Sequence, residues 1–301
     1  MASRSFPLVL LALVALAGCQ KPAPVVDTAT PDASVLSAVA GLKTADFKTL
    51  VQTQVPPAEL QRLREEWKLE RTSKPITDED RRNFAEMMTS LTAPGAEAEL
   101  YKKLDPQLAK MEAELSANLP AWIDLGRALV EGGIKSAKEM TEAQKQEAIK
   151  SLDSIARWAK TIKFTDREQA KRTIAVACRV ARALKLKTLD EARALEFDQA
   201  LEKFGIVFAG LKEILANYGL SLDKVLDTVQ AQTLAQAGDT AKVAVSYTLL
   251  DTPIRYETEM TRIDGHWYGK DALERLRKAK AEAAGVPGAE PPEPPAPGDK
   301  G

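Results

Sequence analysis

The residues best suited to chemistry are few in this 301-residue chain, which contains one histidine, His266, and two cysteines, Cys19 and Cys178. A single imidazole excludes a zinc site built on a histidine pair, and two cysteines provide no thiolate cluster. A Ser-His-Asp or Cys-His arrangement would have to use His266 itself. Glycine-rich phosphate-binding loops are also absent from the sequence. We therefore predict no catalytic residue, no metal site and no cofactor.

Cys178 lies in the segment TIAVACRVARAL, where Ile174 and Ala181 share its helical face. A reactive thiol needs access to solvent and a nearby positive charge that lowers its pKa. The apolar spacing around Cys178 instead favours a buried and inert side chain over a functional one.

Carboxylates are numerous, and two of them facing each other across a groove would be able to hydrolyse the glycan of a cell wall. The chain has 43 Asp and Glu residues, with clusters such as Glu65-Glu66 and Asp78-Glu79-Asp80. Most of them stand at expected helix caps or on polar helix faces. We interpret them as solvated surface residues, and we keep a glycan hydrolase as an alternative.

Cys19 follows an apolar run of 12 residues, from Phe6 to Ala17, which is preceded by one base, Arg4. A membrane-spanning helix needs roughly 20 residues. The run is therefore too short to cross a membrane comfortably and is typical of a secretory signal peptide.

The end of this run, Leu16-Ala17-Gly18-Cys19, resembles the lipobox of bacterial lipoproteins residue for residue. The resemblance implies a signal peptide over residues 1–18, cleavage between Gly18 and Cys19, and acyl chains such as palmitate on Cys19. Each buried methylene contributes about 0.8 kcal/mol, so two or more chains hold a protein stably at a membrane. Gln20 in place of Asp implies, by the same resemblance, the outer membrane of a Gram-negative bacterium, on the side that faces the periplasm.

The charge of the mature chain is close to balanced. Removal of residues 1–18 takes Arg4 from 42 bases and nothing from 43 acids, which leaves 41 against 43, a net charge of −2. Such a balance gives no long-range attraction to nucleic acid or to anionic lipid. With Cys19 acylated, Cys178 has no partner within the chain, so a disulfide scaffold is excluded.

Helical signals fill the middle of the chain, and we expect a helical domain over residues 34–239. The segment before it, residues 19–33, is expected to be a flexible tether. A tether of this length reaches at most ~45 Å at about 3.3 Å per residue. Helix starts are indicated by pairs of a hydroxyl residue and an acid or amide three positions later, with a simpler cap at Ser221. The pairs are Thr77 with Asp80, Thr141 with Gln144, Thr165 with Glu168, and Thr188 with Glu191.

Prolines and glycines indicate where these helices end. Pro106 should kink or divide a helix over residues 100–115, and Pro120 and Gly132-Gly133 should bound a shorter one. The most regular apolar stripe runs from Thr188 to Tyr218, and Gly219 follows it in a position suited to end a helix. No internal repeat is found, so the sequence predicts an irregular helical bundle rather than a solenoid.

Alternating strand chemistry replaces the helical pattern from residue 240. The segments AKVAVSYTLL and IRYETEMTRI are separated by Asp251-Thr252-Pro253, and Asp264-Gly265 leads into His266-Trp267-Tyr268. We predict a mainly α protein with a C-terminal three-stranded antiparallel meander packed on the bundle. The second part, residues 240–284, ends in a helix that begins near Asp271. Residues 285–301 contain six prolines, cannot form a core and are expected to be a disordered tail.

The hairpin around Asp264-Gly265, with the start Gly238-Asp239-Thr240-Ala241-Lys242-Val243, resembles the terminal hairpin of NTF2-like lipoprotein domains. This likeness covers about thirty residues, and the strands found are too few for the cone-shaped fold of that family. No ligand pocket is carried over from it. His266, Trp267 and Tyr268 are candidate partner-binding residues, and the simpler interpretation is that Trp267 and Tyr268 cover the core.

Amphipathic helices on a membrane tether are suited to protein recognition. We therefore expect a non-enzymatic envelope lipoprotein with a protein-binding or structural role, with the membrane and another envelope protein as partners. One version is an immunity lipoprotein that neutralises a toxin in the periplasm. The alternatives are the glycan hydrolase and a lipid or small-molecule carrier, which would need a sizeable apolar cavity.

Overall fold

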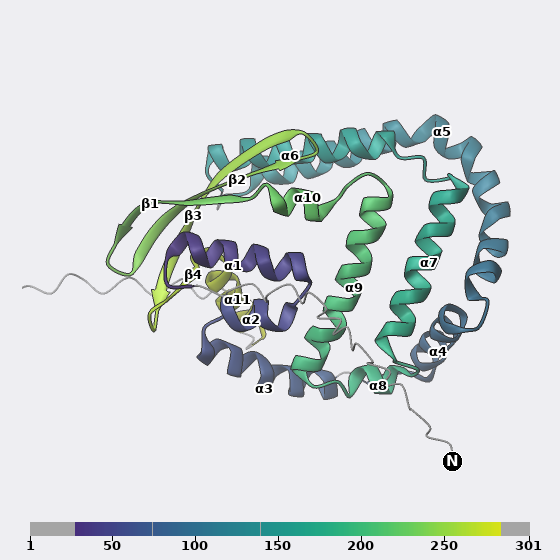
Figure 1. Ribbon diagram of the computed structural model, residues 1–301, viewed down its shortest axis with the longest axis horizontal. Helices are drawn as coiled ribbons and strands as arrows, with labels where there is room; N and C mark the ends of the chain where they lie inside the picture. The colour runs from purple at the N-terminus through teal and green to yellow at the C-terminus, as the bar shows by residue number, and fades with distance from the viewer. Residues whose placement is uncertain (1–27, 74, 139, 284–301) are drawn as a thin grey trace, which may run out of the picture.

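The computed structural model describes residues 28–283 except 74 and 139, and Figure 1 shows the arrangement of its elements. The predicted signal peptide, Cys19, residues 20–27 and the tail 285–301 lie outside the described residues. The described elements are α1 (Pro31–Thr44), α2 (Phe47–Gln54), α3 (Pro57–Ser73), α4 (Asp78–Thr92), α5 (Ala96–Ser136), α6 (Glu142–Thr161), α7 (Arg167–Leu184), α8 (Leu189–Arg193), α9 (Phe197–Asn217), α10 (Leu222–Asp227), β1 (Gln230–Ala237), β2 (Thr240–Leu249), β3 (Thr252–Ile263), β4 (His266–Gly269) and α11 (Lys270–Ala283). The expectation of a mainly helical protein with a small antiparallel C-terminal sheet is confirmed.

Most of the predicted helix starts are confirmed. Complete capping boxes begin α4 at Thr77, α6 at Thr141 and α8 at Thr188, while Ser221 caps α10. The box predicted at Thr165 is wrong, because Asp166 caps α7 by accepting a hydrogen bond of 2.9 Å from the N–H of Gln169. A carboxylate is a stronger acceptor than a hydroxyl and interacts favourably with the positive end of the helix dipole.

The folded body begins before residue 34, where the tether was expected to end. Thr30 caps α1, which starts at Pro31. Thr28 is already buried, and its carbonyl oxygen accepts a hydrogen bond of 3.1 Å from the N–H of Trp267. The start of the described chain is thus attached to the last strand of the sheet.

Helix α5 runs through both of its prolines. Of the kink or division predicted at Pro106, the division does not occur, and the prediction that Pro120 and Gly132-Gly133 bound a shorter helix is wrong. Proline removes one hydrogen bond from the helix and favours a bend. Figure 1 shows α5 as a single curved helix that forms the outer rim, with α7 and α9 side by side inside the curve. Helix α5 packs against α4, α6 and α7.

The long apolar stretch from Thr188 to Tyr218 is not one helix. It divides into α8 and α9 between Arg193 and Phe197, and Gly219 ends α9 with a φ of 90° as predicted. Helix α9 packs closely against neighbouring segments at two glycines, Gly205 and Gly210. A Cβ on Gly205 would lie 2.3 Å from the carbonyl oxygen of Ala45, and one on Gly210 would lie 2.3 Å from Cγ2 of Val180 on α7.

The sheet has four antiparallel strands in the order β1-β2-β3-β4, one more than the three predicted. Strand β1 was expected to be helical, because its sequence QAQTLAQA consists mainly of good helix formers. Its pairing with β2, for example Ala231 with Val245, outweighs this local preference. The β3–β4 turn at Asp264-Gly265 is confirmed, with φ values of 50° and 82°.

Two clusters join the sheet to the bundle, which confirms that the sheet packs on the helices. One consists of buried residues of β2, β3 and β4 with Val35 of α1 packed against it: Ala241, Val243, Val245, Met260 and Trp267. The other unites Leu220, Leu249 and Ile254 with Trp158 of α6 and Leu215 of α9.

Candidate protein-binding surface

The predicted partner-binding residues of the last hairpin are divided between core and surface. The side chains of Trp267 and Tyr268 are only 1% and 3% exposed, and the carbonyl oxygen of Trp267 accepts a hydrogen bond of 2.6 Å from the hydroxyl of Ser34. His266 is exposed, and its Nδ1 lies 2.7 Å from the hydroxyl oxygen of Thr28. Trp267 and Tyr268 therefore cover the core, and a partner-binding role of this segment stays a prediction.

Cys178 is a core residue, in agreement with its predicted burial. Its side chain is 0% exposed. Burial raises the pKa of the thiol, and the negative charge of Glu97 acts in the same direction. The neutral thiol therefore predominates near neutral pH, which is the opposite of what a nucleophile requires.

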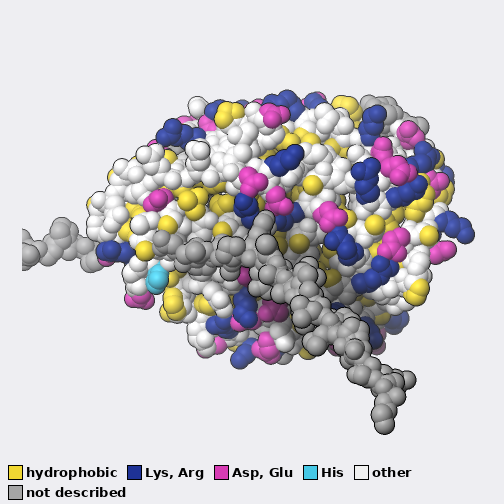
Figure 2. Space-filling model, in the orientation of Figure 1, with side chains coloured by type: hydrophobic (Ala, Val, Ile, Leu, Met, Phe, Trp, Pro, Cys, Tyr) yellow, Lys and Arg dark blue, Asp and Glu magenta, His cyan; other side chains and the backbone are white. Residues whose placement is uncertain are grey.

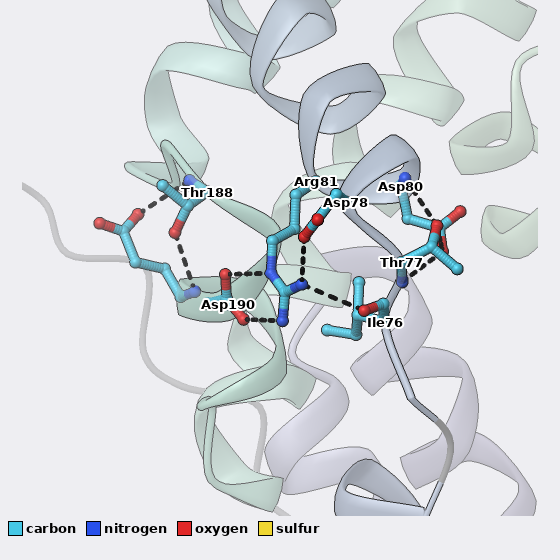
Figure 3. Close-up of polar contacts among 8 residues, drawn as sticks. Ile76, Thr77, Asp78, Asp80, Arg81, Thr188 and Asp190 are labelled. Atoms are coloured by element: carbon cyan, nitrogen blue, oxygen red, sulfur yellow. Dashed lines mark hydrogen bonds and ion pairs between the residues drawn. The ribbon is translucent and has the colours of Figure 1, made fainter.

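Charged side chains of both signs are interspersed over the face of the molecule shown in Figure 2. The acidic cluster at Asp78 and Asp80 belongs to the start of α4, beside the start of α8 (Figure 3). Arg81 joins the two helices, since its Nε and Nη2 donate to the carboxylate of Asp190 at 2.9 and 3.3 Å. This group of charges has a structural explanation in helix capping and helix pairing.

The resolved pKa shifts of the described carboxyl groups all have the same direction. A glycosidase acid needs a raised pKa, whereas every described Asp or Glu with a shifted pKa is shifted downward. Glu147 is typical, because hydrogen bonds from Lys150 and from the N–H of Arg255 lower its pKa. In the described part of the chain, no group of three or more His, Cys, Asp or Glu residues is arranged to hold a metal ion.

An apolar face of α5 is exposed to solvent in its C-terminal half. The side chains of Trp122, Leu125 and Leu129 are 54%, 61% and 71% exposed. Spacings of three and four residues place them on one side of the helix. We call Trp122, Leu125, Gly126, Leu129 and Gly133 the α5 stripe.

Both glycines of the α5 stripe are open on the side where a side chain would stand. A Cβ built on Gly126 or Gly133 would meet no atom within 4 Å other than those of its chain neighbours and of the adjacent backbone of α5. Glycine inside a helix costs about 1 kcal/mol relative to alanine. Packing within the described chain gives no compensation for this cost, whereas a partner whose backbone approaches the helix closely would give one.

The charged residues of the same segment lie on the opposite side of α5, toward α6. Arg127 donates to Asp153 of α6 at 2.8 Å and to Glu131 at 2.9 Å, and Lys160 of α6 lies 2.5 Å from Asp124. Helix α6 thus covers the polar side, and the α5 stripe contains no charge. Contiguous exposed apolar surface of this kind marks interaction sites on soluble proteins.

The α5 stripe was not among the predicted site residues. Its spacing of three and four is readable in the sequence, but the same spacing describes helix faces that are buried. Only the placement of α6 reveals which side of α5 is left uncovered.

Comparisons with known proteins do not assign this chain to a family. No protein-family model, curated protein or solved structure matches the chain. None of the helices formed by the described residues combines the length and apolar character needed to cross a membrane.

Proposed function

We propose that this protein is a non-enzymatic, membrane-tethered component of a bacterial cell envelope that binds another envelope protein through the α5 stripe. The observation that carries the proposal is the exposed, charge-free face formed by Trp122, Leu125 and Leu129. Tryptophan is enriched among the residues that dominate binding energy at protein interfaces. The open glycines beside it favour a partner that presents an apolar helix.

Membrane attachment is the second part of the proposal, and its support is the lipobox resemblance that ends at Cys19. Because the described fold starts at Thr28, eight residues separate it from Cys19. A chain of eight residues spans at most ~29 Å. The body would therefore stay close to the lipid surface, where a partner anchored in the same membrane is at high effective concentration.

Co-purification from detergent-solubilised envelopes tests the proposal. We expect a double variant, Leu125→Ser with Leu129→Ser, to recover at least tenfold less of the partner protein than the unchanged chain. Each lost apolar contact costs on the order of 1 kcal/mol or more, and about 1.4 kcal/mol corresponds to a tenfold change in affinity.

The matched control is Leu69→Ser, which removes an exposed leucine of α3 that is 70% exposed. This variant should recover the partner at the level of the unchanged chain. Equal recovery with the α5 double variant would contradict the proposal, as would a second copy of this chain as the sole partner recovered.

A further inference from the structure

A groove with one apolar wall and one charged wall lies between α6, the β2–β3 hairpin and α11. Its volume is about 550 Å³, which falls within the range of roughly 300–1,000 Å³ found for small-molecule sites. The residues of the apolar wall lie on the two strands, on α6 and just before its cap: Met140, Ala148, Tyr247, Ile254 and Tyr256. None of them belongs to the α5 stripe, so the groove is separate from the proposed protein-binding surface.

Two tyrosines make the apolar wall aromatic. The rings of Tyr247 on β2 and Tyr256 on β3 lie 6.4 Å apart at an angle of 77°, and Tyr256 is 39% exposed. An aromatic ring has a partly negative face, which attracts the weakly positive C–H groups of a ligand. The ring of Tyr256 is thus suited to a ligand with C–H groups on one face and polar groups around its edge.

Helix α11 forms the opposite wall with charges of both signs. Asp271, Glu274, Arg275 and Lys278 follow one another at spacings of three, one and three residues, which places them on one side of the helix. All four are exposed, and within the described chain none of their side chains forms a salt bridge. The Nε of Arg275 donates to the backbone carbonyl of Asp271 at 3.3 Å. The wall therefore offers carboxylate acceptors beside cationic donors.

This mixture of charges disfavours most classes of ligand. The carboxylates of Glu147, Asp271 and Glu274 repel an anion, and the side chains of Arg275 and Lys278 repel a cation. A purely apolar ligand would remove water from these groups without replacing its hydrogen bonds. A neutral ligand with many hydroxyl groups avoids these costs, because a hydroxyl donates to a carboxylate and accepts from an ammonium or guanidinium group.

The groove continues past Tyr256 into a second hollow of about 530 Å³. Tyr256 and Asp271 line both hollows. The second hollow is polar, with the hydroxyl of Thr258 and with Lys242, which pairs with Glu257 at 3.2 Å. This shape favours a ligand of several linked units over a single small ring.

We propose that the groove binds a neutral oligosaccharide, with one sugar ring against Tyr256 and its hydroxyl groups on the charged side chains of α11. A pyranose ring has C–H groups on its faces and hydroxyl groups around its edge, which matches the two walls. The site does not depend on the proposed protein partner or on the lipid anchor. Amino-sugar glycans of a cell wall and plain glucose polymers share this chemistry, so the test includes one of each.

Fluorine NMR on the full chain labelled with 3-fluorotyrosine tests this proposal, since the chain has only five tyrosines. The probes are N-acetylchitotetraose, a chain of N-acetylglucosamine, and maltotetraose, a chain of glucose. We expect saturable shifts of the Tyr247 and Tyr256 signals, while those of Tyr101 and Tyr218 stay in place. A response to N-acetylchitotetraose alone would assign the site to amino-sugar glycans, and a response to both probes would assign it to oligosaccharides in general. No shift with either probe would overturn the proposal.

Variants and salt make the test specific. Tyr256→Ala, read from the Tyr247 signal, and Glu274→Ala with Arg275→Ala should each weaken binding at least tenfold. The matched control, Phe164→Ala, removes an aromatic ring of similar exposure, 41%, that does not line the groove and should leave the affinity unchanged. Because the ligand is neutral, the affinity should change less than about twofold when salt is raised from about 0.05 to about 0.5 M. Unweakened binding by Tyr256→Ala, or a steep loss of affinity with salt, would contradict the proposal.

Discussion

The ion pair between Glu97 and Arg182 links α5, the outer helix, to α7 inside its curve. The two guanidinium nitrogens donate to the two carboxylate oxygens at 2.6 and 3.0 Å. The hydrogen bonds from Arg182 lower the pKa of Glu97 from 4.5 to about 2. Because the folded pKa lies below the unfolded one, this contribution to stability is present above about pH 4.5 and is lost as the pH falls toward 2.

Replacing Glu97 with Gln should remove this pH dependence. We expect the free energy of unfolding of the unchanged chain to fall more steeply between about pH 5 and pH 2 than that of Glu97→Gln. The stability difference between the two proteins should therefore shrink as the pH falls. Urea unfolding at several pH values measures it, and a difference that stays constant would show that the pair does not act in this way.

At the residue scale, contacts between residues close in the sequence could be predicted, whereas contacts between residues far apart in the sequence could not. The burial of Cys178 and the caps at Thr77, Thr141 and Thr188 follow from neighbours within four positions. Lys212 is different, because it is buried at 9% exposure and its ammonium group contacts the carbonyl oxygen of Lys43 at 2.6 Å. No local pattern connects residues that are 169 positions apart.

At the element scale the errors arise where tertiary contacts outweigh local preference. Strand β1 has a helix-forming composition but pairs with β2. Helix α5 continues through Pro106, which was expected to kink or divide a helix, and through Pro120, which was expected to bound one. The hairpin at Asp264-Gly265 was predictable, because a two-residue turn with positive φ values strongly prefers such residues.

The glycines of α9 and α5 give opposite expectations for the same substitution. Gly210→Ala would place a Cβ 2.3 Å from Val180 and should destabilise the protein by about 1–3 kcal/mol. Gly126→Ala meets no atom within 4 Å other than those of its chain neighbours and of the adjacent backbone of α5, and it should stabilise the isolated chain by up to about 1 kcal/mol. The midpoints of urea unfolding measure both effects.

Partner binding should respond differently to Gly126→Ala. If the backbone of a partner approaches α5 at this glycine, the variant recovers less partner although its fold is more stable. A destabilised Gly126→Ala variant would mean that the side of α5 assigned as open is in fact packed.

At the scale of the whole molecule, the sequence predicted a helical body with a small sheet packed on it, which the structure confirms, while the attachment of that body to a membrane stays a prediction. The sequence did not show that α6 covers one side of α5 and leaves the other exposed. The arrangement in Figure 1, with α5 as the outer rim, presents that helix to other molecules.

Membrane attachment predicts a specific effect of Cys19→Ser. The variant should move from the membrane fraction to the soluble fraction and should lose incorporation of labelled palmitate, because Cys19 is the proposed acylated residue. Cys178→Ala removes the other cysteine and should leave both properties unchanged. Unaltered membrane fractionation of Cys19→Ser would disprove the lipid anchor.

The central claim, that the α5 stripe binds a protein in the envelope, is tested most directly by cross-linking in intact cells. A photoreactive phenylalanine analogue at Leu125 should form a covalent adduct with one defined envelope protein. The same analogue at Lys110, which is exposed on the same helix, should not form this adduct. An identical pattern of adducts at the two positions, or no adduct at Leu125, would contradict the claim.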